Sequence, residues 1–173
     1  MSVYLYRPEA DEYKSLRVPG RLFDLFDKKQ PLAPTWRPLR VEGFHEDIGR
    51  PMGDFPSSTS NMPILSARAW EVLKPLIGAE VEELPILVDS TVYYAIHVLD
   101  VVDCLDYVHS QVERFSNGRM MMVTKYAFIE ERIKGKHMFQ LPENYNSVTL
   151  VSGTFVQAVE MNKLRGLSAF QLT

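Results

Sequence analysis

Hydrophobic and polar residues alternate along several short segments of the chain, a pattern typical of β-strands. In segment 91–99 apolar residues fill both faces of the predicted strand: Val92, Tyr94, Ile96 and Val98 on one, Tyr93, Ala95 and His97 on the other. Such a strand is typical of the centre of a sheet covered on both sides. Further strands are predicted at residues 3–6, 36–41, 81–88, 120–129, 137–141, 148–151 and 167–172. Pro38 would confine the strand at 36–41 to a sheet edge.

Two segments, at about 66–77 and 152–164, have the periodicity of amphipathic helices. Ser66 and Ser152 stand at their N-cap positions, where a hydroxyl accepts a hydrogen bond from a free backbone amide. Pro75 falls in the last turn of the first helix, and Gly78 and Gly166 suit a left-handed exit after each helix. A short helical turn is predicted at residues 21–27, and residues 130–134 could form another or continue the strand before them.

The predicted strands outnumber the helices and do not alternate with them. This favours an α+β fold with a mixed or mostly antiparallel sheet of five or more strands. A length of 173 residues predicts one domain, 1–173. Segment 43–63 is rich in Gly, Pro and Ser and has no clear period, so we expect a long loop that is either functional or disordered.

Composition excludes several classes of protein. Hydrophobic residues at 46% and charged residues at 24% are globular values, and a net charge of -3 gives no footprint for nucleic acid. A single cysteine, Cys104, excludes an internal disulfide and a cysteine pair for zinc. No leader and no apolar run of about 20 residues is visible, so we expect a cytoplasmic protein with no membrane contact. No motif indicates a cofactor, and the sequence is silent on oligomeric state.

Acidic residues gather in the middle of the chain. Residues 61–110 hold eight acids and two cations, a net charge of -6 within a chain of -3. Such a block could steer a basic partner, although the acids could equally be dispersed and merely solvated. The candidate partner-binding residues are six of these acids and two residues of the long loop: Glu80, Glu82, Glu83, Asp100, Asp103, Asp106, Asp54 and Phe55.

The alternative is a metal-dependent hydrolase. Asp100, Asp103 and Asp106 recur every three residues, and clustered carboxylates suit a hard cation such as Mg²⁺. On a helix the three would be neighbours, whereas on a strand Asp103 would face away from the other two. We expect surface acids or partner contacts here more often than a metal site.

Other reactive residues have ordinary structural interpretations. Cys104 with His109 could form a nucleophile and base, but a free cysteine is usually a small buried hydrophobe. His45-Glu46-Asp47 lacks the second histidine of the H-E-x-x-H zinc motif, so we expect it to be solvated. We expect Trp70 and His97 in the core, and Met120-Met121-Met122 as core and linker rather than a binding surface.

A family resemblance adds to this. Its segments are Asp54-Phe55-Pro56, the run from Pro63 to Leu76, Val102 to Asp106 with Ser110, Met138 to Leu141, Val151-Ser152 with Phe155, and Leu164 to Leu167 with Phe170. In this order, over about residues 54–173, the chain resembles a family of bacterial polymorphic-toxin immunity proteins, first described as a domain of unknown function.

The resemblance implies a non-catalytic cytoplasmic protein that binds and neutralises a cognate secreted toxin, often a nuclease. It carries no catalytic residues to transfer. An acidic face would suit the basic cleft of a nuclease, which is the link between the resemblance and the acidic block.

Overall fold

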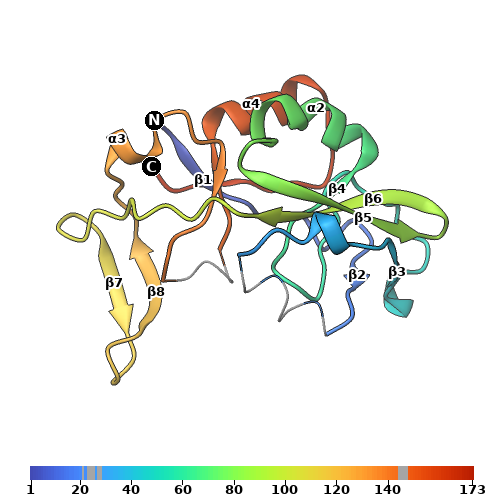
Figure 1. Cartoon of the computed structure of the whole chain (residues 1–173), viewed down its shortest axis with the longest axis horizontal. Coiled ribbons are helices and arrows are strands. Elements are labelled where there is room, and N and C mark those ends of the chain that lie inside the picture. The colour runs from blue at the N-terminus through green and yellow to red at the C-terminus, as the bar shows by residue number, and fades with distance from the viewer. Residues whose placement is uncertain (21, 23–25, 27–28, 144–147) are drawn as a thin grey trace.

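The strands of the protein form two sheets and a separate hairpin (Figure 1). The computed structural model describes residues 1–20, 22, 26, 29–143 and 148–173. The first sheet contains β2 (Leu16–Arg17), β3 (Leu39–Gly43), β4 (Ile64–Ser66), β5 (Val81–Val88) and β6 (Thr91–Val98). The second contains β1 (Val3–Leu5), β9 (Met138–Phe139), β10 (Leu150–Ser152) and β11 (Phe170–Gln171). The hairpin is β7 (Gln111–Arg114) with β8 (Met120–Lys125).

Short helices complete the fold. They are α2 (Ala67–Ile77), α3 (Glu130–Ile133) and α4 (Gly153–Met161), with 3-10 turns η1 (Ala33–Thr35) and η2 (His45–Asp47). The predicted α+β class is therefore confirmed. Among the described residues, no helix combines the length and the apolar content of a membrane span.

The first sheet has the strand order β2-β3-β5-β6-β4. β3 and β5 run parallel and the other neighbours antiparallel, so the expected mixed sheet is confirmed. β6 lies between two strands, as its two apolar faces predicted. Pro38 lies just before β3, which begins at Leu39. Residues 39–41 pair with β5 alone and β2 pairs only with Glu42 and Gly43, so the part of the predicted strand that forms has one free edge, as expected.

Both faces of this sheet are covered. α2 and α4 pack together over one face (Figure 1), where Trp70, Leu73 and Phe155 meet Ile96 in a buried cluster. The N-terminal segment lies against the other face in a second cluster. The helical turn expected at 21–27 lies largely outside the described residues, of which Leu22 and Phe26 are buried in that second cluster.

The two predicted N-caps are confirmed. The Ser66 hydroxyl accepts a hydrogen bond from the Ala69 amide at 3.1 Å, and that of Ser152 accepts one from Phe155 at 3.2 Å. Gly78 does not make the predicted left-handed exit, because its φ is -61°. A Cβ there would lie 2.7 Å from the Lys74 carbonyl oxygen, so close approach requires this glycine. Gly166 does adopt the predicted left-handed conformation, at φ +94°.

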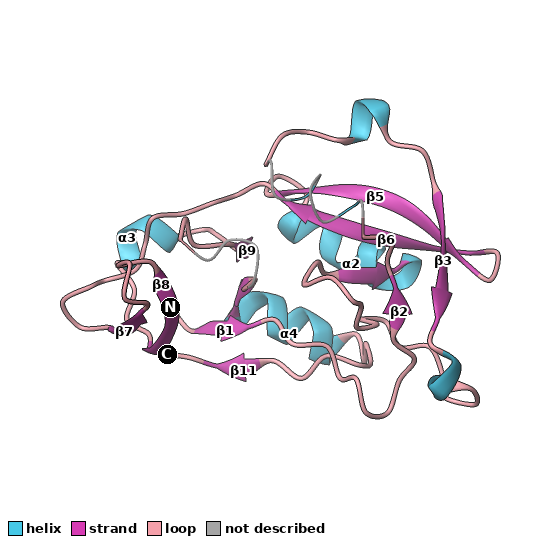
Figure 2. Ribbon diagram, turned by 90° about the horizontal axis from the view of Figure 1, so that it is seen from below, coloured by secondary structure: helices cyan, strands magenta, loops and turns pink. Residues whose placement is uncertain are grey.

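The second sheet joins the two ends of the chain. Its order is β11-β1-β10-β9 and all its pairs are antiparallel, which places the termini near each other (Figure 2). A third buried cluster connects this sheet to β8 of the hairpin, through Phe139, Leu105, Met120 and Val123. The sequence left open whether residues 130–134 form a helical turn or continue the strand before them. β8 ends at Lys125 and α3 begins at Glu130, so the helical turn forms.

The long segment 43–63 runs beside residues 14–18. The Leu16 amide donates to the Ser57 carbonyl at 2.8 Å, and the Thr59 amide donates to the Leu16 carbonyl at 3.0 Å. Asp54 in this segment lies at a junction of three parts of the chain. Its Oδ1 accepts from the Ser66 hydroxyl at 2.6 Å and its Oδ2 from the Arg165 amide at 2.8 Å.

We predict that Asp54→Ala lowers the free energy of unfolding by about 1–2 kcal/mol, because two donors lose their acceptor. Urea unfolding measures this. Asp103→Ala is the control: its side chain is 69% exposed, so a change within about 0.5 kcal/mol is expected. Equal stability of the Asp54 variant and the unmodified protein would contradict the role of this junction.

Candidate functional site

Three of the eight predicted partner-binding residues lie inside the protein. Phe55 has an exposed fraction of 0% and its ring packs edge-on against Tyr6, so it offers no surface to a partner in this conformation. Glu80 is buried, and its carboxylate accepts hydrogen bonds from the His137 and Met138 amides, the latter at 2.6 Å. Burial raises the pKa of Glu80. Asp54 is nearly buried at the junction described above.

Glu82 holds the N-terminal segment against the sheet. Its carboxylate accepts hydrogen bonds from the amides of Leu32 and Ala33 at 2.8 and 2.9 Å, and lies 3.1 Å from Nδ1 of His97. Burial works to raise the pKa of Glu82, but these hydrogen bonds outweigh it and lower the pKa overall. His97 is buried, which confirms its predicted place in the core, and burial lowers its pKa.

The three aspartates of the alternative metal site each face a different basic side chain. Asp100 lies 2.7 Å from the Lys136 ammonium and Asp103 lies 3.1 Å from the Arg132 guanidinium. The third, Asp106, lies 2.7 Å from Nδ1 of His109, which lowers the Asp106 pKa. Within the described ranges, no group of three His, Cys, Asp or Glu side chains is arranged to hold a metal ion.

Few of the predicted acids remain open to a partner. Glu83 is exposed beside Lys74, at 3.3 Å, and Asp103 is the most exposed of the set. Asp106 is partly exposed, and its Oδ1 accepts hydrogen bonds from the backbone amides of Val108 and His109. Asp103 and Asp106 lie on the segment between β6 and β7, where each faces a different partner, Arg132 and His109. Glu83 lies apart from them on β5.

The hairpin carries exposed apolar residues that sequence reasoning missed. The Met120-Met121-Met122 run is not core and linker throughout: Met120 is buried, but Met121 and Met122 are 47% and 49% exposed. Phe115 near the tip is 43% exposed, and Tyr107 and Val108 at the base are also exposed. The presence of three adjacent methionines was the available signal, since methionine is common on adaptable binding surfaces.

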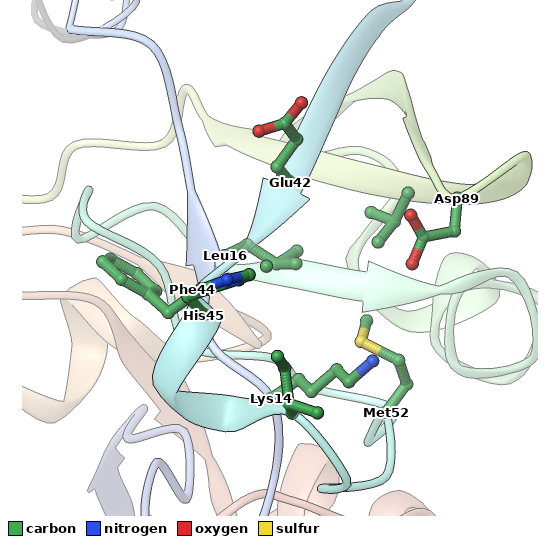
Figure 3. A pocket seen from close by; sticks show the side chains of 10 residues that line it. Lys14, Leu16, Glu42, Phe44, His45, Met52 and Asp89 are labelled. Carbon is green, nitrogen blue, oxygen red and sulfur yellow. The ribbon is translucent and has the colours of Figure 1, made fainter.

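A separate hollow of about 300 Å³ lies beside η2. Figure 3 shows Lys14 extending toward Met52, with Glu42 on β3 and Asp89 after β5 on its rim. No hydrogen bond or ion pair joins Lys14, Glu42, His45 or Asp89 to one another in the described part of the chain. The polar groups of this hollow therefore do not form a catalytic arrangement like a nucleophile paired with a base.

The turn η2 contains the His45-Glu46-Asp47 sequence, and Asp47 is not solvated as we expected. It is buried because its carboxylate accepts the Ser15 amide at 2.9 Å and pairs with Arg50 at 2.7 Å. Asp47 therefore holds the long segment against the N-terminal one, and its role is structural.

The model of one family, the Immunity protein family (Imm11), matches residues 8–171. This match confirms the resemblance. It also extends the resemblance over most of the first 53 residues, where no matching motif was found in the sequence. None of the curated proteins matches the chain.

Cys104 provides a test of the thiol alternative. It is fully buried, and burial together with the nearby Asp103 carboxylate raises its pKa to about 11. We predict that a thiol reagent labels Cys104 in the native protein at least about 100-fold more slowly than in the urea-unfolded protein, because the reactive thiolate is scarce and enclosed. Absorbance of the released chromophore measures the rate. Native labelling as fast as that of free cysteine would restore Cys104 as a candidate nucleophile.

Proposed function

The chain belongs to the Imm11 immunity protein family, and we propose that it binds and neutralises the cognate toxin of a bacterial polymorphic toxin system. Neutralisation occurs in the cytoplasm, by direct contact, and the chain catalyses no reaction of its own. The family match over residues 8–171 is the observation that carries this proposal.

The arrangement of the carboxylates also supports a binding role. Asp100, Asp103 and Asp106 pair with Lys136, Arg132 and His109 respectively, so the charges on which a metal-dependent hydrolase would depend are engaged separately. Of the eight candidate residues, the proposal keeps Glu83, Asp103 and Asp106 as partner contacts. The other five have structural contacts within the chain: Asp54, Phe55, Glu80, Glu82 and Asp100.

We predict that the product of the gene encoded immediately upstream kills a bacterial host when expressed alone and is harmless when coexpressed with this chain. Purified, the two should form a complex with a Kd of about 1 nM or tighter, because even a few free toxin molecules are lethal. Colony counts and isothermal titration measure the two effects. The control is the same toxin with an unrelated protein of similar size.

Titration of the chain with Mg²⁺, Mn²⁺ and Zn²⁺ separates this proposal from the hydrolase. A binding protein requires no metal, so no saturable heat is expected. An upstream product that is harmless alone, or a toxin that still kills in the presence of the chain, would refute the proposed function.

A further inference from the structure

The β7–β8 hairpin extends away from both sheets (Figure 1) and has the structure of a supported arm. Along β8, Met120 next to the turn and Val123 in the middle of the strand are buried in the third cluster with Leu105 and Phe139. Its tip is closed by a turn in which the Gly118 amide donates to the Phe115 carbonyl, with Gly118 in the left-handed conformation at φ +83°. This turn geometry is typical of a well-defined hairpin loop with a glycine bulge.

Exposed apolar side chains gather on this arm. Phe115, Met121 and Met122 each leave more than two-fifths of their surface exposed, and Tyr107 and Val108 extend the surface to the base. Large apolar groups exposed together on one element mark an interaction site more often than scattered ones do. Aromatic residues and methionine are also enriched at the centres of protein interfaces.

The arm is shaped for side-chain contacts rather than for strand addition. The register shifts between Gln111 and Val112 and between Glu113 and Arg114, so that β8 carries the extra residues Met121 and Thr124. Such bulges twist an edge strand away from the flat geometry that a further strand needs, and they redirect side chains.

Several arginine contacts hold the exposed rings in place. The Arg119 guanidinium lies over the Phe115 ring, 5.6 Å from its centroid. Arg114 lies over the Tyr107 ring at 5.9 Å and pairs with Glu143 at 3.0 Å, and the Tyr107 hydroxyl donates to the same carboxylate. Binding therefore costs less side-chain ordering than it would from a loose loop.

The charge of the arm indicates the chemistry of its partner. Residues 107–125 contain three cations, Arg114, Arg119 and Lys125, against the single anion Glu113, in a chain whose net charge is -3. Because Arg114 pairs with Glu143, Arg119 and Lys125 supply the basic charge beside the exposed apolar residues. Such a surface is complementary to an apolar cleft with carboxylates at its mouth.

We propose that the β7–β8 hairpin is the element that enters the toxin, with Phe115, Met121 and Met122 in an apolar cleft and with Arg119 and Lys125 facing acidic side chains at its mouth. This inference rests on the proposed function and names the surface that performs it.

The test uses the full chain and the upstream gene product. Replacing Phe115, Met121 and Met122 together by serine should raise the Kd of the complex by at least about 100-fold, because apolar anchors at the centre of an interface carry most of its affinity. The matched control replaces three exposed apolar residues on other elements by serine, Ile48, Val92 and Met161, and should change the Kd less than about threefold. Thermal unfolding checks that both variants fold.

A second variant tests the charge. Arg119→Glu with Lys125→Glu should slow association at least about tenfold at low salt and abolish most of its salt dependence, because electrostatic steering acts chiefly on the association rate. The fold is not at risk, since both residues are exposed. Stopped-flow fluorescence measures the rate.

Each outcome decides the inference. If the unmodified chain neutralises the toxin and the triple serine variant neutralises it equally well, the hairpin proposal is overturned and the proposed function stands. A hairpin variant that disrupts a dimer of this chain and leaves toxin affinity unchanged also overturns it, by showing that the arm pairs copies of the chain. If the unmodified chain fails to bind the toxin at all, the proposed function and the inference fall together.

Discussion

The structure depends on one constraint, namely that a carboxylate withdrawn from water must have donors to replace the water. Asp47, Asp54, Glu80 and Glu82 meet it in the same way. Each accepts hydrogen bonds from backbone amides of a segment distant in the sequence: Ser15, Arg165, His137 with Met138, and Leu32 with Ala33. Most of these amides belong to irregular segments or begin a short turn, and Met138 begins the edge strand β9. The buried acids therefore fasten the loops of the protein to its sheets.

This constraint explains which parts of the fold could be predicted. Helix caps at Ser66 and Ser152 and the strands 81–88 and 91–98 depend on neighbours in the sequence, so local periodicity identified them. The role of Glu80 depends on amides 57 and 58 residues away. No local pattern in the sequence indicates such a partner. The acids of residues 61–110 were therefore predicted to lie on the surface. The family resemblance identified the function class, because it compares the whole order of segments rather than any one of them.

The hairpin escaped prediction for a different reason. Period-two alternation identifies the exposed face of a regular strand, but β8 contains two extra residues relative to β7. Each shifts the alternation by one position, so buried Met120 is followed by two exposed methionines. A regular strand would have turned one of the two toward the body. The bulges that blunt the edges of this hairpin thus also create its exposed apolar surface.

These two features divide the chain between folding and binding. Many acidic side chains that could have formed a charged exterior instead bind amides and basic side chains of the same chain. These contacts hold the loops and sheets of the protein body together. Large apolar side chains, which most proteins bury, are left exposed on an arm that is anchored in a core cluster through Met120 and Val123 and whose rings are held by arginines. Left exposed, they add nothing to the stability of the free protein, and covering them on a partner gains the free energy of their burial. Because the arm is already ordered, little of this gain is lost to conformational entropy on binding.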